Sequence, residues 1–148
     1  AKVVSSIWQA LKPNGRFVAE FGGKGNIDYI TDALRNALDG IGDLVTRRRH
    51  PWYFPSLSEY TTLVQDQGFR VAHKQIFERP TPLDAGENGL SNWIAMFGET
   101  FLTGLTAHQR QEVVENVMEQ LRPTLFLNGS WVADYVRIRV ICLKNADN

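Results

Sequence analysis

The longest regular alternation of apolar and polar residues lies near the end of the chain, in the run Trp131–Leu143. Apolar residues recur at every second position over 136–142, and arginines occupy two of the positions between them. Successive side chains of a β-strand point to opposite faces, so this pattern predicts one long strand over 131–143. Two shorter alternating runs, 16–21 and 69–77, predict the strands that flank it.

Apolar residues at helical spacing predict the helices that connect these strands. The predicted helices are 2–12, 26–40, 56–68 and a pair over 86–121, of which the first bends at Gly98. Asn26 is the expected N-terminal cap of the second helix. Ser56 with Glu59, and Thr106 with Gln109, have the spacing of a capping box, in which two side chains satisfy the free amides of a helix start.

Prolines and glycines mark the predicted breaks between elements. The turn Leu11–Gly15 ends the first helix, because proline cannot continue the hydrogen-bond ladder. The stretch Arg122–Ser130 contains a proline and a glycine and is a predicted loop. The stretch 46–55, with three arginines followed by aromatic residues, is a predicted extended connection.

Composition limits the classes of partner. The chain has 148 residues, of which 43% are hydrophobic, as expected of one folded domain. Its 16 basic and 16 acidic residues balance, so no overall positive charge attracts nucleic acid or an acidic membrane, and the expected partner is a small molecule or another protein. No run is long and apolar enough to span a bilayer.

Cys142 is the only cysteine, which excludes an intrachain disulfide and a zinc site built from several thiolates. It is best explained as a small core residue. The three histidines are isolated in the sequence, so no metal site is predicted. A reducing, cytoplasmic location is the expectation that fits this cysteine usage.

The order of several motifs resembles one enzyme family. The run L-K-P-N-G-R-F-V-A-E-F at 11–21 resembles the entry to the fifth strand of class I S-adenosylmethionine-dependent methyltransferases, with Asn14 in place of a usual glycine. Gly68–Val71 resembles the entry to the sixth strand of that family, and 135–144 resembles its seventh. The resemblance covers nearly the whole chain.

That resemblance implies an α/β, partial Rossmann-like methyltransferase fold. Its sheet order, 3-2-1-4-5-7-6, implies a three-stranded mixed sheet in which the last strand is central and antiparallel to both neighbours. Asn92–Trp93, then 121–123, then the glycine loop before the last strand are similar to the helical insert of trans-aconitate methyltransferase and its small-molecule relatives. Residues 86–130 are therefore the expected helical insert, or lid.

The family's glycine-rich loop, its ribose-binding acidic residue and its fourth strand have no counterpart in this sequence. The chain also begins inside a predicted helix, so we expect 1–148 to be a single domain that is the C-terminal part of a methyltransferase domain. The resemblance implies S-adenosylmethionine as the cofactor of the full-length enzyme. No cofactor-binding residue, and no bound cofactor, is expected in this chain.

Ligands of open α/β sheets bind at the carboxyl ends of the parallel strands. That edge would collect residues after the strands at 16–21 and 69–77 and at the start of the last strand, where Asp134 also lies. The predicted substrate-binding residues are Glu20, Phe21, Gly22, Tyr53, Phe54, Trp93, Tyr135 and Arg137. No catalytic residue is predicted, because methyl transfer depends mainly on alignment and exclusion of water.

Each candidate has a structural alternative. Glu20 is more simply an ion-pair partner of Arg137 or Arg139 than a base. Trp93 and Phe97 have helical spacing and fit core packing as well as a substrate pocket. The arginines at 47–49 fit a solvated loop better than a carboxylate site.

Two functions from different classes follow. The first is the substrate-side half of a methyltransferase that acts on a small molecule, with an organic acid as one candidate, and that is inactive as a fragment. The second is a non-enzymatic binding or interaction domain derived from that fold. Because the strand at 16–21 would lack its fourth-strand neighbour, we expect a homodimer or another edge-to-edge assembly through it.

Overall fold

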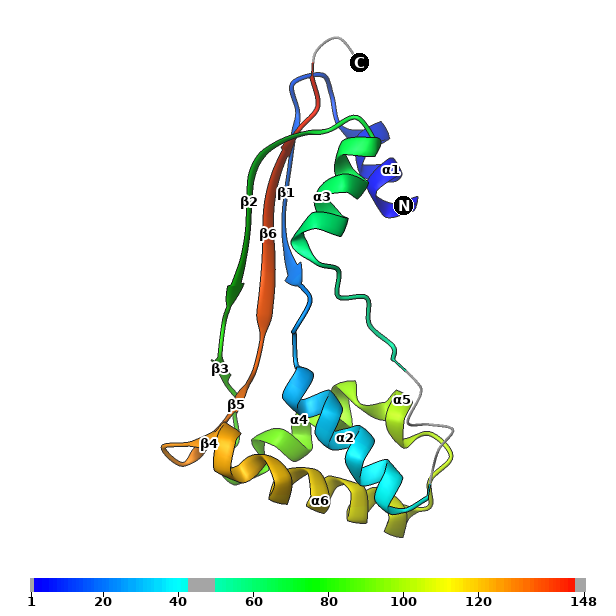
Figure 1. Cartoon of the computed structure of the whole chain (residues 1–148), viewed down its shortest axis with the longest axis vertical. Coiled ribbons are helices and arrows are strands. Elements are labelled where there is room, and N and C mark those ends of the chain that lie inside the picture. Colours follow the sequence, from blue (N-terminus) through cyan, green and yellow to red (C-terminus); the bar gives the residue numbers. More distant parts are fainter. Residues whose placement is uncertain (1, 43–49, 146–148) are drawn as a thin grey trace. The chain divides into compact units, whose positions relative to one another are not determined.

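The computed structural model describes residues 2–42 and 50–145. They fall into two compact units, each built from segments that are far apart in the sequence (Figure 1). The sheet unit comprises Ala1–Asn26, Tyr53–Arg79 and Val136–Asn148, and the helical unit comprises Ile27–Trp52 and Pro80–Tyr135. The organisation of 1–148 as one domain with an insert at 86–130 stays a prediction.

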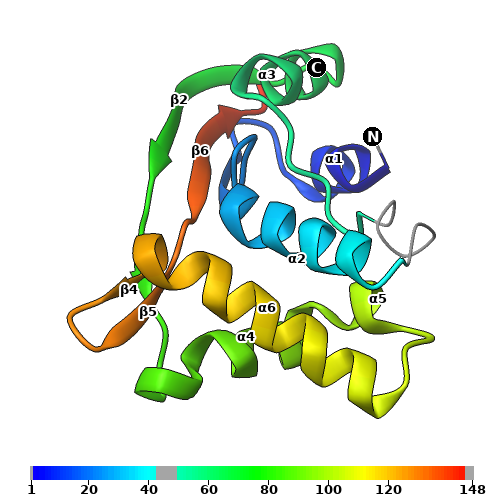
Figure 2. The same cartoon turned by 60° about the horizontal axis from the view of Figure 1, so that its bottom comes forward.

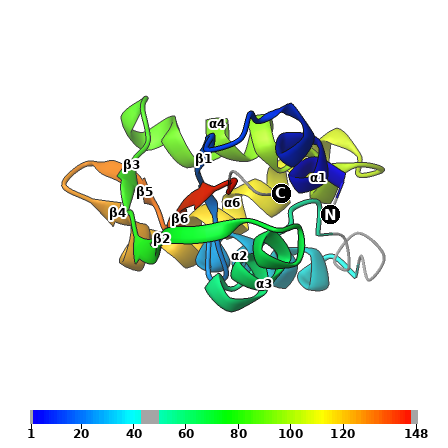
Figure 3. The ribbon, with the colours of Figure 1, turned by 90° about the horizontal axis from the view of Figure 1, so that it is seen from above.

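The sheet unit is organised around its last strand. Its strands are β1 (Arg16–Gly22), β2 (Arg70–Glu78) and β6 (Val136–Leu143), in the order β1-β6-β2, and β6 is antiparallel to both neighbours. The same order is visible end-on in Figure 3. The predicted fold class, with a central antiparallel last strand, is therefore confirmed.

One face of this sheet forms the core of the unit. The helices α1 (Lys2–Ala10) and α3 (Leu57–Asp66) lie on the same side of the sheet (Figure 1). The buried residues beneath them are Val4, Tyr60, Val64, Phe69, Ile138, Val140 and Cys142. The three from β6 alternate along the strand and are fully buried, so the period-2 pattern and the core position of Cys142 are confirmed.

Local sequence signals explain the ends of these elements. Asn14 adopts a φ of 62°, which confirms that asparagine takes the left-handed turn position. The side chain of Ser56 accepts from the amide of Glu59, and that carboxylate accepts from the amide of Ser56 at 2.7 Å, so the first capping box is confirmed. The second, at Thr106 and Gln109, is confirmed as well.

The helical unit contains most of the helices and a small sheet. Its helices are α2 (Asp28–Gly40), η2 (Gly86–Asn88), α4 (Gly89–Phe97), α5 (Glu99–Leu102) and α6 (Ala107–Leu125). The strands β3 (Thr81–Pro82), β4 (Phe126–Leu127) and β5 (Ser130–Ala133) pair in the order β3-β5-β4. Helices α2 and α6 lie side by side (Figure 2), and α4 and α5 meet at Gly98, as predicted.

Three predictions about this chain are wrong. Asn26 does not cap α2, because its Oδ1 accepts from the amide of Val136 at 3.0 Å and Ile27 is the N-cap. The run 131–143 is not one strand, because β5 ends at Ala133 and β6 begins at Val136. The predicted loop after residue 121 is largely helical, because α6 continues through Pro123 to Leu125.

Contacts of Arg122 explain why α6 continues past the proline. Its guanidinium lies over the rings of Phe126 and Trp131, with its carbon 4.5 Å and 5.4 Å from the two ring centroids. It also donates two hydrogen bonds to the carboxylate of Glu87. These contacts, with the burial of Leu125, stabilise a last turn that proline alone would disfavour.

Lys144 stabilises the end of α1 from a distant part of the chain. Its Nζ donates to the backbone carbonyls of Trp8 and Leu11 at 2.9 Å and 3.0 Å. Helix α1 has no basic residue in its own last turn, so this ammonium supplies the positive charge that helix C-termini favour.

We predict that Lys144→Met lowers the unfolding free energy by about 1–2 kcal/mol, because methionine keeps the apolar stem but leaves two carbonyls without their donor. Urea unfolding followed by circular dichroism measures the change. Lys74→Met, at an exposed position of β2, is the matched control and should be neutral. Equal stability of the two variants would contradict the role of Lys144.

Candidate functional site

The predicted site residues divide between the two units. Six belong to the sheet unit, namely Glu20, Phe21, Gly22, Tyr53, Phe54 and Arg137. Trp93 and Tyr135 belong to the helical unit. Their joint membership of one substrate site stays a prediction, and each group is described within its own unit.

Glu20, at the carboxyl-terminal part of β1, is held by two arginines. Its Oε2 accepts from Nη2 of Arg139 at 2.6 Å, and its Oε1 accepts from Arg79. The guanidinium carbon of Arg139 also lies 5.1 Å from the ring centroid of Phe77. The hydrogen bond from Arg139, with the charges of both arginines, lowers the pKa of Glu20. A carboxylate held in this way is a poor proton acceptor, which favours the ion-pair alternative.

The space beside the glycines at the end of β1 is filled by neighbouring side chains. A Cβ at Gly22 would lie 2.6 Å from the ring of Phe54, and one at Gly23 would lie 2.7 Å from Ile138. Phe21 packs against Tyr60, with ring centroids 4.4 Å apart. These glycines therefore allow close packing within the sheet unit, and Phe21 and Phe54 are packing residues there.

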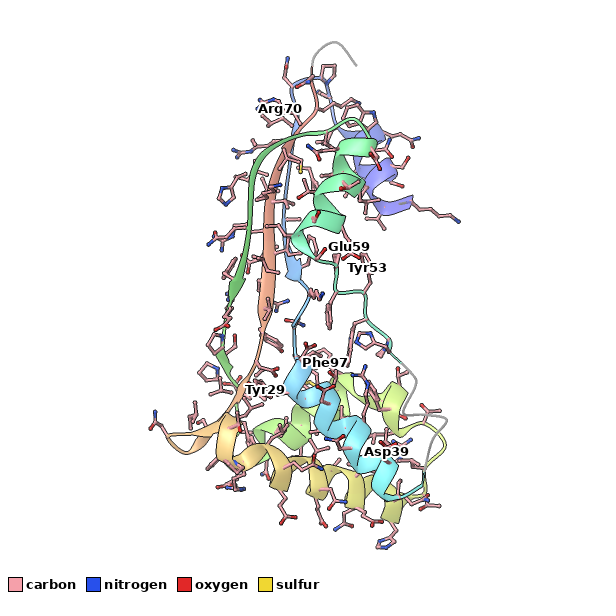
Figure 4. All side chains as sticks on the ribbon, viewed as in Figure 1. Tyr29, Asp39, Tyr53, Glu59, Arg70 and Phe97 are labelled. Atoms are coloured by element: carbon pink, nitrogen blue, oxygen red, sulfur yellow. The ribbon has the colours of Figure 1, made fainter. Side chains whose placement is uncertain are left out.

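Tyr53 lies over the start of α3, where Figure 4 shows it beside Glu59. Together with Thr62, Leu63 and Asp66 they line a hollow of about 570 Å³. The hydrogen bonds from Ser56 lower the pKa of Glu59, which is already used in the capping box. Glu59 is therefore a poor proton acceptor for any ligand in this hollow.

A cavity of about 280 Å³ lies within the helical unit. It is lined by Pro82, Leu83, Asp84, Ala85, Gly89, Asn92, Trp93, Met96, Phe97 and Tyr135. Nε1 of Trp93 donates to the hydroxyl oxygen of Tyr135 at 2.8 Å. The ring centroids of Trp93 and Phe97 are 5.3 Å apart, and the ring planes are inclined at 49°. Helix α4 supplies one wall, since its residues 89, 92, 93, 96 and 97 share a face.

The sequence pattern found part of this cavity and missed the rest. Trp93 and Phe97 were candidates from their spacing, and the structure brings Tyr135 to them. Trp52, which was not singled out, extends the aromatic cluster. Its ring centroid lies 6.2 Å from that of Trp93 and 5.8 Å from that of Phe101. Asp84 was also missed, because no motif or periodic pattern of the sequence distinguishes it from its neighbours.

Asp134 holds the start of α2 rather than lining the cavity. Its Oδ2 accepts from the amide of Tyr29 at 2.8 Å, and its backbone carbonyl accepts from Ile27 at 3.0 Å. Ile27 has a φ of 55°, which is unusual for a β-branched residue, and lacks a capping side chain. The carboxylate of Asp134 therefore takes the place of a local cap.

Three further expectations from the sequence concern the arginines at 47–49, metal binding and membrane spans. The arginines at 47–49 lie outside the described residues. In the part of the chain that the structure describes, no group of three or more His, Cys, Asp or Glu side chains could hold a metal ion. No described helix is long and apolar enough to cross a membrane.

Comparison with known proteins relates these features to one class of enzyme. No family model matches the chain. An uncharacterized methyltransferase of Schizosaccharomyces pombe is 27% identical over 146 residues, which cover 96% of this chain. A protein of Bacillus halodurans C-125, provisionally assigned as a methyltransferase, matches 96% of this chain and 56% of its own, with a TM-score of 0.52 at 13% identity. The resemblance to methyltransferases is confirmed.

The chain spans 54% of the length of the curated methyltransferase that it matches. Phosphoethanolamine N-methyltransferase 2 of Haemonchus contortus, solved with phosphomonomethylethanolamine and S-adenosylhomocysteine, matches 97% of this chain and 29% of its own. Its TM-score is 0.37 at 16% identity, and so loose a superposition supports no argument about fold or ligand. The closer pattern of trans-aconitate methyltransferase stays a prediction.

We predict a pH effect from Asp134. Burial raises the pKa of this carboxyl above its ordinary 3.8 and outweighs the hydrogen bond from the amide of Tyr29, which lowers it; the charges of Asp28 and Asp32 raise the pKa by smaller amounts. The folded chain then holds the proton more tightly than the unfolded chain. The unfolding free energy due to this group therefore falls as pH rises from the unfolded pKa through the folded pKa, and is constant above it.

Asp134→Asn should remove this slope. The measurement is the difference in unfolding free energy between the wild type and the variant, from about pH 4 to pH 7. Carboxyls with lowered pKa values, such as Glu20 and Glu59, are present in both proteins and cancel. Glu112→Gln, at an exposed position of α6, controls for the charge change. A difference independent of pH would contradict the raised pKa.

Proposed function

We propose that this chain is the substrate-side, C-terminal part of an S-adenosylmethionine-dependent methyltransferase that acts on a small molecule. The observation that carries the proposal is the sheet order β1-β6-β2 with an antiparallel central β6. It is the strand arrangement that the resemblance implies for the end of a methyltransferase domain. The match to a methyltransferase over 96% of the chain supports it.

The described residues do not themselves fit the cofactor. Phe54 and Ile138 occupy the space beside the glycines at the end of β1, and the carboxylate of Glu20 accepts hydrogen bonds from two arginines. The backbone of these glycines is therefore not open to close approach by a nucleotide, and Glu20 is not available to accept hydrogen bonds from ribose hydroxyls. We therefore assign the cofactor to the other part of the enzyme, and none to this chain.

The contribution of this chain would be substrate binding and exclusion of water. A methyl group moves by direct displacement, so catalysis depends on holding the acceptor in line and keeping the site dry. The cavity beside α4, with Trp93 fixed by its hydrogen bond to Tyr135, provides apolar walls with few ionisable groups. Such walls suit positioning better than acid–base catalysis.

The test compares this chain with the full-length protein. Both are incubated with S-adenosylmethionine labelled in its methyl group and with a filtered extract of small molecules or a macromolecular fraction. Full-length protein is expected to label the small-molecule fraction, and this chain alone is expected to label neither and to give no heat of cofactor binding in calorimetry. Label in macromolecules only would contradict the substrate class, and tight cofactor binding by this chain would contradict its assigned role.

The same experiment separates the enzyme from the alternative function. A non-enzymatic binding domain derived from the fold would transfer no label in either form of the protein. A cytoplasmic location fits both functions and stays a prediction.

We also propose self-association through β1. This strand pairs with β6 on one side and has no second partner among the described strands, and Val18 at its middle is 54% exposed. A free strand edge favours pairing with another chain. A dimer of this chain would join two such edges.

Val18→Lys should convert that dimer into a monomer, because a charge on an edge strand opposes pairing. Light scattering coupled to size exclusion measures the mass. Val3→Lys makes the same change at an exposed position of α1 and should leave the dimer intact. A wild-type monomer would refute the proposal.

A further inference from the structure

The balanced charge of the chain conceals a difference between its two units. The helical unit contains eleven Asp or Glu residues and six Arg or Lys residues, a formal charge of −5, whereas the sheet unit contains five and ten, a charge of +5. The helical unit has no lysine at all. The field around its cavity therefore favours a positively charged ligand.

The described arginines of the helical unit are already engaged. Arg35 pairs with Asp32 at 3.0 Å, Arg110 with Glu99 at 2.8 Å, and Arg122 with Glu87 at 2.5 Å. None of these arginines lines the cavity. A carboxylate ligand would find no basic partner among the described lining residues.

Asp84 is the one acidic residue among the described residues that line the cavity, and unlike the arginines it is not paired with any of them. Asp84 is exposed, and it makes no side-chain hydrogen bond or ion pair with the residues that the structure describes. Its segment packs closely on α4, since a Cβ at Gly89 would lie 2.9 Å from the carbonyl oxygen of Asp84. Because Gly89 has no side chain, the backbone of Asp84 can pack against the start of α4, which forms one wall of the cavity.

Aromatic rings form the rest of the recognition chemistry. Trp93, Phe97 and Tyr135 all line the cavity, and Trp93 is 4% exposed and fixed to Tyr135 by its hydrogen bond. Phe97 is 50% exposed and Met96 is 67% exposed, so apolar surface is open to a ligand (Figure 4 labels Phe97). Ring faces attract cations, and several rings with a carboxylate are suited to quaternary or methylated ammonium groups.

We propose that this cavity binds an organic ammonium group, with the rings of Trp93, Phe97 and Tyr135 around it and the carboxylate of Asp84 as its counter-ion. That the ammonium group belongs to the molecule that accepts the methyl group is a step that rests on the proposed function. The binding itself does not, because it requires neither cofactor nor methyl transfer. The substrate class is then an organic amine or ammonium compound rather than an organic acid.

The test is a titration of the whole chain with tetramethylammonium chloride, followed by the indole N–H resonances in nitrogen-edited NMR. Trp93→Phe assigns the resonance of Trp93 among those of the four tryptophans. Tert-butanol serves as a neutral probe of similar shape, and citrate serves as an anionic probe. Sodium chloride at equal concentration controls for ionic strength.

Tetramethylammonium is expected to shift the Trp93 resonance in a saturable way, and the other two probes are not. Asp84→Asn and Phe97→Leu should each weaken binding roughly two- to five-fold, as expected for one exposed charge and one exposed ring face. Both positions are exposed, so the variants should fold, which unchanged dispersion of the spectrum verifies. Glu112→Gln removes an exposed acid elsewhere in the helical unit and should bind as the wild type does.

An equal response to tert-butanol, or saturable binding of citrate at Trp93, would overturn the proposal. Equal weakening by Asp84→Asn and Glu112→Gln would also overturn it, since the net negative charge of the unit, and not the carboxylate of Asp84, would then attract the cation. These results are separate from the fate of the proposed function. A full-length enzyme that methylates only acids would refute the amine class while leaving methyl transfer intact.

Discussion

The pairing of β6 with both β1 and β2 is the interaction on which the sheet unit depends. In its register, Ile138, Val140 and Cys142 face the core beneath α1 and α3. A slip of one residue would turn every side chain of β6 to the opposite face and bring Arg139 toward that core. The same register places Arg139 opposite Glu20, so the apolar core and the ion pair of these two residues have one structural cause.

Sequence patterns predicted those parts of the fold that depend on neighbouring residues. The alternation in β6 and the capping boxes at Ser56 and Thr106 are local, and the structure has all of them. The errors involve contacts between distant residues. Asn26 fits a cap by type, but Val136, 110 positions later, takes its side chain, while Asp134 reaches Tyr29 over 105 positions. No local pattern contains that information.

The candidate site divides in the same way. Trp93 and Phe97 share a helix face, so their spacing alone suggested that they act together. The meeting of Trp93 with Tyr135 requires the strand break after Ala133, which an alternating pattern cannot reveal. The charge difference between the units was hidden for another reason, because their segments interleave along the chain and only the contacts show which charges belong together.

The central place of β6 has a consequence for how the protein forms during translation. The strands β1 and β2 do not pair with each other, since each bonds only to β6 within the described sheet. Ribosomes make β6 after both of them, so the backbone N–H and C=O groups that will pair with β6 have no partner in the sheet while more than fifty further residues are added after β2. Pairing between such distant segments forms slowly. Nascent chains of this protein therefore present unpaired strand edges to other chains and to chaperones until the last strand emerges.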